Sequence, residues 1–433
     1  MKPARMPFEI PGHLTVENHH LHIGGLDAVA LAEEYGTPLY VTSEDRLRAN
    51  YRRFARAFPG ASIFFAAKAN NNLVVQRILA QEGAGADAFS DGEIYLARLA
   101  GIPADKILFT GNSKTDDELR YAVDAGVMVS VDSHDELVAL SKIADAAGRE
   151  VKIAFRVNPD VDARAHPKLA TGLGKSKFGI PRGEIVATYR EAKRLPGVKP
   201  AGIHCHIGSQ ILEAGPGPFA EATAKMMDLV AQICGFVDLE WVDLGGGYGI
   251  PYQKNIKPTE PEVWANAIVP IFRERCEQLG IRPELHLEPG RYIVADTTIL
   301  LMRVNTVKRS SSHFVGTDAG FNTLLRPAMY DAYHEAVIAN KADLAPADTY
   351  TIVGPVCESG DILATDRRLP EVRKGDLIAL LDAGAYGFCM GSQYLGRPRS
   401  AEVLVGGGRA ELVRKRETFD DLLQNQIVPG RLL

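Results

Sequence analysis

The chain has 433 residues, of which 46% are hydrophobic and 24% charged, a usual composition for a folded protein long enough for two domains. A net charge of -5 without long lysine or arginine runs argues against nucleic acid as a partner. We also expect no signal peptide and no membrane span, because the N-terminus is not apolar and no apolar run reaches about 18 residues.

Taken in chain order, residues 1–40 contain short strand-like runs at 14–16, 21–23 and 39–40. In residues 41–295, short runs rich in β-branched and apolar residues alternate with segments of helical periodicity. The candidate strands are 62–69, 85–90, 107–111, 128–133, 152–157, 202–208, 241–246 and 284–289. The candidate helices between them are 72–82, 116–125, 134–147, 182–194, 218–234 and 262–279. Eight strand-then-helix units predict a (β/α)8 barrel of the TIM type.

The sequence pattern changes after residue 296, where helical periodicity is lost. Short β-rich runs follow at 299–307, 313–318, 350–353, 377–381 and 401–405, punctuated by Gly, Pro and Asp. We therefore expect a mostly β C-terminal domain over residues 296–433. Residues 1–40 could join it across space, so that the fold class is an α/β barrel plus a β domain.

The five cysteines are Cys205, Cys234, Cys276, Cys357 and Cys389. None stands at CxxC spacing, which argues against a structural zinc site or a redox motif. Free thiols in a reducing cytoplasm are the simplest interpretation.

Lys68 stands at the end of the first candidate strand, after the apolar residues Phe64 to Ala67. Burying an unpaired lysine costs several kcal/mol. A lysine whose pKa is lowered by burial can form a Schiff base. Considered alone, a surface lysine at a strand end is the more ordinary explanation.

Polar residues and glycines also end the later strands. They are Asp87, Arg156, the run His204 to Gln210, the run Gly245 to Gly249, and the run Glu288 to Arg291. Because the C-terminal strand ends of such a barrel converge, these residues predict one common site.

This set could hold a phosphate-bearing pyridine cofactor. The glycine run lets backbone N–H groups approach a phosphate, although a tight turn would also explain it. Ser209 could bind the same phosphate, the ring of His206 could stack on the pyridine, and Glu288 could keep the pyridine nitrogen protonated. In one strand His204 and His206 would share a face, but no third zinc ligand is evident, and we expect no metal.

Three further clusters lie in the β domain. Arg326 to Tyr330 combines a guanidinium, suited to carboxylates, with a phenol. Cys357 to Asp361 brings together a thiol and two acids, and Asp382 to Tyr386 ends on a tyrosine. In isolation, each is ordinary for a polar loop.

In this order, the motifs resemble those of the diaminopimelate decarboxylase family, a pyridoxal-phosphate (PLP) group with the alanine-racemase fold that includes eukaryotic ornithine decarboxylases. The resemblance runs from about Tyr40 to Leu423. Its marks are Ala67 to Asn70, His206 to Gln210, Gly245 to Gly247, Glu288 to Arg291, Arg326-Pro327 with Tyr330, Cys357 to Asp361, and Asp382 to Tyr386. Thr171-Gly172 and Ser176 to Gly179 are similar to the diaminopimelate branch.

The resemblance implies a PLP-dependent conversion of meso-2,6-diaminopimelate to L-lysine and CO2, the last step of lysine biosynthesis. PLP would be bound by Lys68, Asp87, Arg156, His206, Ser209, Gly246, Gly247, Glu288, Gly290, Arg291 and Tyr386. The substrate would be bound by Arg291, Arg326, Tyr330, Glu358 and Tyr386. Cys357 would donate a proton in the partner subunit's site of a homodimer.

One stretch departs from the resemblance. The family usually has Asn-Tyr-Asn where this chain has Gln393-Tyr394-Leu395. The substrate could therefore be another basic amino acid, of the ornithine, lysine, arginine or carboxynorspermidine type. A racemase is less favoured, because a racemase should prefer a weaker electron sink than a cofactor ring protonated by Glu288 provides. A non-catalytic relative could have lost Lys68 and Cys357.

Overall fold

The computed structural model describes residues 6–163, 177–309 and 313–432. The chain divides into two compact units, which are described separately. The barrel unit comprises Arg48–Pro251 and Lys257–Val294. The β unit comprises the described residues within Met1–Leu47, Tyr252–Ile256 and Ala295–Leu433.

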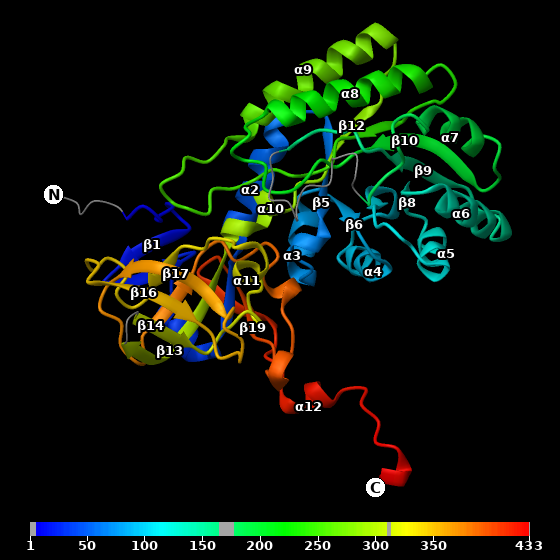
Figure 1. Cartoon of the computed structure of the whole chain (residues 1–433). Helices are drawn as coiled ribbons and strands as arrows, with labels where there is room; N and C mark the ends of the chain where they lie inside the picture. The colour runs from blue at the N-terminus through cyan, green and yellow to red at the C-terminus, as the bar shows by residue number, and fades with distance from the viewer. Residues whose placement is uncertain (1–5, 164–176, 310–312, 433) are drawn as a thin grey trace. The chain divides into compact units, whose positions relative to one another are not determined.

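The barrel unit is built on eight parallel strands that close in the order β10-β11-β12-β5-β6-β7-β8-β9 (Figure 1). They are β5 (Ala61–Ala66), β6 (Gly85–Ala88), β7 (Ile107–Phe109), β8 (Met128–Val131), β9 (Val151–Arg156), β10 (Val198–His204), β11 (Trp241–Asp243) and β12 (Glu284–Leu287). The predicted barrel is confirmed, and its strands are shorter at their C-terminal ends than expected.

Helices alternate with these strands along the chain. They are α2 (Glu44–Ala57), α3 (Leu73–Gln81), α4 (Asp91–Leu99), α5 (Asp116–Ala125), α6 (His134–Ala146), α7 (Ile185–Ala192), α8 (Gly217–Ile233) and α9 (Pro261–Leu279). Helices α2 and α4 were not predicted; α4 has a glycine in its first turn and buries only Ile94 and Ala97.

Side-chain caps start several helices shortly after a strand ends. Asn72, Ser90, Thr115 and Ser133 each accept a hydrogen bond from a backbone N–H of the first turn of α3, α4, α5 and α6. Such caps satisfy N–H groups that have no partner within the helix. They fix short, defined loops at the carboxyl end of the barrel.

The β unit contains a nine-stranded sheet with the main path β17-β16-β14-β13-β4-β19-β20, to which β15 and β18 are added. These strands are β4 (Leu39–Ser43), β13 (Thr298–Arg309), β14 (His313–Thr317), β15 (Ala336–Ile338), β16 (Asp348–Val353), β17 (Ile362–Leu369), β18 (Leu377–Leu380), β19 (Ala401–Gly406) and β20 (Arg409–Arg414). A separate three-stranded sheet contains β1 (Leu14–Glu17), β2 (His20–Ile23) and β3 (Leu26–Asp27).

The N-terminal segment contributes a central strand to this sheet. β4 pairs antiparallel with β13 and parallel with β19. Both faces are buried, with Leu39 and Val41 in one apolar cluster and Tyr40 in another, as the period of two along a strand requires. No described helix is long and apolar enough to cross a membrane.

Two predicted strands end before residues assigned to them. Lys68 lies in a short 3-10 turn, η1 (Ala67–Ala69), directly after β5. β10 ends at His204, so His206 lies in the following loop. The prediction that His204 and His206 share a strand face is therefore wrong. The family-like residues Thr171, Gly172 and Ser176 lie outside the described part of the chain.

Candidate active site

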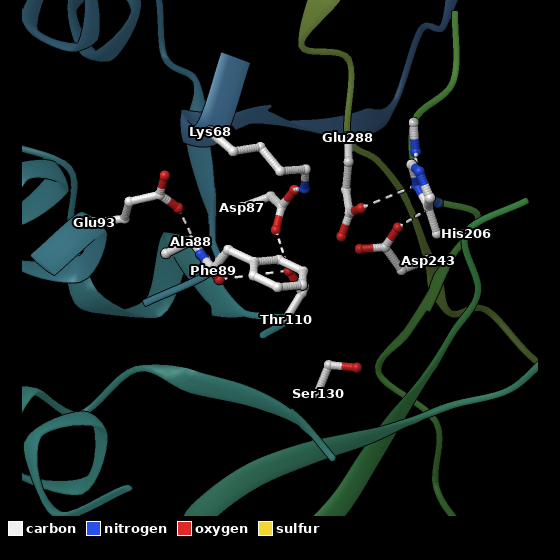
Figure 2. A network of polar contacts seen from close by, with 12 residues as sticks. Lys68, Asp87, Ala88, Phe89, Glu93, Thr110, Ser130, His206, Asp243 and Glu288 are labelled. Atoms are coloured by element: carbon white, nitrogen blue, oxygen red, sulfur yellow. Dashed lines mark hydrogen bonds and ion pairs between the residues drawn. The ribbon is translucent and has the colours of Figure 1, made fainter. Parts of the chain in front are cut away.

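The side chain of Lys68 meets a buried carboxylate at the carboxyl end of the barrel. Its Nζ forms an ion pair with Oδ2 of Asp87 on β6, whose Oδ1 accepts a hydrogen bond from the hydroxyl of Thr110. Asp87 is fully buried, whereas the Lys68 side chain is 30% exposed. The Lys68 amine is therefore held by a buried charge partner, on a side chain that is itself partly exposed (Figure 2).

Glu288 lies on the opposite side of this site, directly after β12 (Figure 2). Its side chain is 2% exposed, and its Oε1 lies 3.4 Å from Nε2 of His204. Burial raises the pKa of Glu288, but its contact with His204 and the charge of Lys68 outweigh burial and lower the pKa to about 2. Glu288 is therefore a carboxylate at neutral pH.

The ring of His206 is neutral. Burial, aided by the charges of Arg156 and Lys68, lowers the pKa of His206 to about 3. The backbone N–H of Gly246 donates a hydrogen bond to its Nδ1 at 3.1 Å, so this nitrogen carries no proton. The 3.9 Å separation between His206 Nδ1 and Glu288 Oε2 is therefore not a charge pair. A flat, uncharged ring borders the site.

The glycine turn after β11 approaches neighbouring backbone very closely. A Cβ atom at Gly246 would lie 2.2 Å from the carbonyl oxygen of Glu288, and Gly247 has a φ of +109° that disfavours other residues. After β12, a Cβ atom at Gly290 would lie 3.0 Å from the Cβ atoms of Ala66 and Ala69, which flank Lys68. These glycines bring the two turns together around the lysine.

Two arginines that were expected at the site, Arg156 and Arg291, belong to the barrel unit. Arg291 Nη2 donates a hydrogen bond to Ser209 Oγ at 2.9 Å, which joins the segments after β10 and β12. Arg156 is 5% exposed, its guanidinium lies 4.4 Å from the ring centroid of Phe178, and burial lowers its pKa. All the barrel residues expected at the site thus lie after, or at the end of, the barrel strands.

Sequence reasoning missed part of the polar interior. Ser130 Oγ lies 2.7 Å from His204 Nδ1. Asp243 accepts a hydrogen bond from Gly245 N–H at 2.8 Å, and burial, with the Glu288 charge, raises the pKa of Asp243 well above its usual range. Potential ligand atoms of His204, Asp243 and Glu288 lie within 4.8 Å of one another, a grouping that was not evident from the sequence. The alternation of polar residues inside β8, β10 and β11 was the available signal.

In the β unit, Arg326 is the first residue of α11 (Arg326–Tyr330) and is 5% exposed. Its Nη1 lies 2.7 Å from His334 Nε2, and its guanidinium lies 4.4 Å from the ring centroid of Tyr252. His334 was not predicted. Tyr330, at the end of this helix, is partly buried.

Cys357 and Glu358 lie on the surface of the β unit. Tyr394, from the loop that departs from the family pattern, donates a hydrogen bond to Glu358, and its ring stacks on Phe321 at 5.8 Å. Leu395 has a φ of 60°, a left-handed conformation that asparagine adopts more readily than leucine. This loop therefore orders the acidic neighbour of Cys357.

Tyr386 also has a left-handed backbone, with a φ of 55°. Four residues earlier, buried Asp382 has a φ of 57° and pairs with Lys254 at 2.6 Å. Non-glycine residues in this conformation are strained, and such strain concentrates at functional sites.

Comparison with known proteins identifies the class. Residues 44–295 match the family model of the pyridoxal-dependent decarboxylase, pyridoxal binding domain. Together with the closed barrel and the Lys68–Asp87 pair, this match makes the chain a PLP-dependent decarboxylase.

The relatives narrow the class to a family. The chain is 53% identical to the diaminopimelate decarboxylase of Archaeoglobus fulgidus, covering 98% of this chain and 99% of the relative. It is 51% identical to that of Methanothermobacter thermautotrophicus, covering 96% and 97%. The crystal structure of diaminopimelate decarboxylase from Methanocaldococcus jannaschii in complex with L-lysine matches with a TM-score of 0.91 at 39% identity, covering 97% of this chain and 99% of that chain. The chain belongs to the diaminopimelate decarboxylase family.

PLP, the cofactor of this class, fits the residues of the barrel unit. The Lys68 side chain is partly exposed and follows strand β5 at the carboxyl end of the barrel. The turn at Gly246 and Gly247 leaves no room for a side chain, which suits close approach of a phosphate to backbone N–H groups. Glu288 Oε1 has no hydrogen-bond partner among the described residues, although it is buried.

Proposed function

We propose that this protein decarboxylates meso-2,6-diaminopimelate to L-lysine and CO2, using PLP. The observation that carries this proposal is the accessible Lys68 amine against buried Asp87, with anionic Glu288 across the site, in a chain of this family. The bound cofactor would supply an electron sink through its protonated ring, which stabilises the carbanion left when CO2 departs.

The residues of the barrel unit would bind and orient the cofactor. Lys68 would hold it covalently, with Asp87 positioning the amine. Glu288 would keep the proton on the ring nitrogen, and neutral His206 would cover the ring face. The phosphate would be bound by Ser209, Gly246 and Gly247, and the remaining barrel-unit contacts would come from Arg156, Gly290 and Arg291. Tyr386, a residue of the β unit, would complete the set.

The substrate and the final proton would be handled mainly by the β unit. Arg326, Tyr330, Glu358 and Tyr386, with Arg291 of the barrel unit, would bind the charged ends of the substrate; buried Arg326 is suited to a carboxylate. The bond between the reacting carbon and its carboxylate breaks, and the electron pair stays on that carbon. Cys357 would then donate a proton to it, forming the new C–H bond.

The proton donor would act in a partner subunit's site, so that the protein works as a homodimer. Cys357 and Glu358 are exposed on the chain that carries them. The following C-terminal segment also presents five exposed apolar side chains, which range from 59% to 88% exposure: Phe419, Leu423, Ile427, Val428 and Leu432. Such a concentration is typical of a surface that packs against another protein. Five unpaired cysteines support a cytoplasmic location.

The reaction is tested by CO2 release from the purified, PLP-loaded protein. The substrate panel is meso-diaminopimelate, ornithine, lysine, arginine and carboxynorspermidine, and the amino-acid product is identified by chiral chromatography. The proposal expects meso-diaminopimelate to give the highest kcat/KM and L-lysine as product. A higher kcat/KM for another amino acid of the panel would identify that amino acid as the substrate instead. No CO2 release from any of the five amino acids would contradict the decarboxylase assignment.

A further inference from the structure

A line of polar side chains runs through the barrel interior and ends at Glu288. Ser130 Oγ lies 2.7 Å from His204 Nδ1, and His204 Nε2 lies 3.4 Å from Glu288 Oε1. Ser130 and His204 are on strands β8 and β10, and Glu288 follows β12. Their side chains are buried, with exposures of 1%, 0% and 3% for the three residues. Figure 2 shows Ser130 and Glu288 on the inner side of the strands.

Hydrogen-bond chemistry determines which nitrogen of His204 carries the proton. Glu288 is a carboxylate, which only accepts hydrogen bonds. A nitrogen that faces it at 3.4 Å is therefore stabilised only as N–H. Ser130 can donate its hydroxyl proton to Nδ1, so that Nε2 is the nitrogen that carries a proton toward Glu288.

Ser130 is itself held by a buried ion pair. Lys114 Nζ donates a hydrogen bond to the backbone carbonyl of Ser130 at 2.8 Å and pairs with Glu136 at 2.6 Å. Both charged side chains are at most 5% exposed. The pair fixes the end of β8, and with it the position of the Ser130 hydroxyl.

His204 Nε2 and Glu288 Oε1 face each other inside the barrel, with the buried carboxyl group of Asp243 nearby. Neither His204 Nε2 nor Glu288 Oε1 has a hydrogen-bond partner among the described residues, and the two atoms lie 3.4 Å apart. A buried donor and a buried acceptor that form no hydrogen bond each cost free energy in the folded state. A small rotation of either side chain would join them.

We propose that His204 is a positioning residue for Glu288: Ser130 fixes its ring, and its Nε2–H holds one carboxylate oxygen so that the other remains available to the cofactor. This inference rests on the proposed role of Glu288 at the ring nitrogen. Residues that orient a functional group through a second hydrogen bond commonly change activity about 10- to 100-fold when they are replaced, as at metal sites.

The first test needs no cofactor. In the apoprotein labelled with 15N-histidine, long-range 1H–15N spectra report which ring nitrogen is protonated, and the His204 signals are assigned by their loss in His204→Gln. We expect the Nε2–H form in the wild type and a measurable population of the Nδ1–H form in Ser130→Ala. A wild-type ring protonated only on Nδ1, or no change in Ser130→Ala, would overturn the proposal.

The second test compares two substitutions at His204 in the PLP-loaded enzyme. His204→Leu removes the donor, whereas the amide of His204→Gln can still donate to Glu288. We expect kcat to fall by about 10- to 100-fold in His204→Leu with little change in KM, and by less than about 10-fold in His204→Gln. The 15N chemical shift of labelled PLP should show loss of the ring-nitrogen proton in His204→Leu alone.

Matched controls separate positioning from damage to the core. Ser141→Ala removes another buried hydroxyl of the barrel unit, which bonds to the Pro196 carbonyl at 2.7 Å. His286→Leu removes another buried barrel histidine, 4% exposed, that stacks on Trp241. Both should change thermal stability without changing the ring-nitrogen signal. If His204→Leu does not fold, Ser130→Ala takes its place in this comparison.

The outcomes distinguish this inference from the proposed function. If Glu288→Gln leaves kcat and the ring-nitrogen signal unchanged, the role of Glu288 itself fails. If Glu288→Gln impairs both while His204→Leu and Ser130→Ala behave like their controls, only the positioning role of His204 fails. A stoichiometric metal ion that is retained by the wild type and lost in His204→Leu would also overturn it.

Discussion

Arg326 and His334 are joined by a hydrogen bond of 2.7 Å between the guanidinium Nη1 and the ring Nε2, in a buried part of the β unit. The other ring nitrogen of His334 lies 2.9 Å from the carbonyl of Leu381, to which it donates. Nε2 is therefore the unprotonated acceptor, and the ring holds the guanidinium in one orientation.

This relationship predicts that His334→Leu weakens substrate binding more than turnover. Without its acceptor, Arg326 loses orientation, and KM for meso-diaminopimelate should rise by about 10-fold, the equivalent of one hydrogen bond to a charged group. Steady-state kinetics provide the measurement. His313→Leu, which removes a partly exposed histidine of the same unit, is the control, and equal KM values for both variants would contradict the role of His334.

Lys68→Ala should abolish decarboxylation and covalent attachment of PLP. The variant lacks the amine that pairs with Asp87. Borohydride reduction followed by peptide mass spectrometry should locate the cofactor on Lys68 in the wild type and on no peptide of the variant. Lys106→Ala, at the opposite end of the barrel, is the control. Wild-type turnover in Lys68→Ala would exclude the assignment.

Glu288→Gln should bind PLP but turn over slowly. The amide cannot hold a proton on the ring nitrogen, so the electron sink is weakened. A loss of kcat on the order of 10^2-fold is expected, as for other groups that stabilise developing charge. Single-turnover CO2 release measures it, with PLP content determined separately. An unchanged kcat with full PLP content would contradict this role.

Glu93→Gln should change how the stability of the apoprotein depends on pH. Burial raises the pKa of Glu93 to about 7, although the N–H of Phe89 donates to its carboxylate at 2.7 Å (Figure 2). In the unfolded chain the pKa is about 4.3, so the folded state binds this proton more tightly, and the wild type loses stability as the pH rises from about 4.5 to 7. Glutamine keeps an acceptor but does not ionise.

Thermal unfolding at several pH values therefore provides the measurement. Glu93→Gln should match the wild type near pH 4.5 and become the more stable protein by pH 8. A constant difference in Tm across this range would show that Glu93 does not titrate as stated.

Lys68→Ala and Cys357→Ala should complement each other if sites are shared between subunits. After random 1:1 subunit exchange, half of the dimers are hybrids with one complete site each, so about a quarter of wild-type activity should return. Differently tagged subunits allow hybrid dimers to be purified and assayed. Cys357→Ala must be strongly impaired by itself. Hybrids no more active than their parents would contradict the shared site.

Much of this protein follows from local sequence signals. The eight strand-then-helix repeats predicted the barrel, because apolar periodicity directly reflects which faces are buried. The residues at and after the strand ends also indicated where Lys68, Asp87 and Glu288 would lie, since parallel strands in a barrel have their carboxyl ends at one rim. The family followed from the order of the motifs along the chain.

Other features depended on tertiary structure. The sequence does not reveal that Asp87 receives the Lys68 amine, that His334 supports Arg326, or that Ser130, His204 and Glu288 form a line. These contacts join residues that are 8 to 84 positions apart, and pairings at such separations are set by strand register and packing rather than by local pattern. The end of β10 at His204 is likewise decided by its pairing with β9 and β11, which leaves His206 in a loop and His204 inside the barrel.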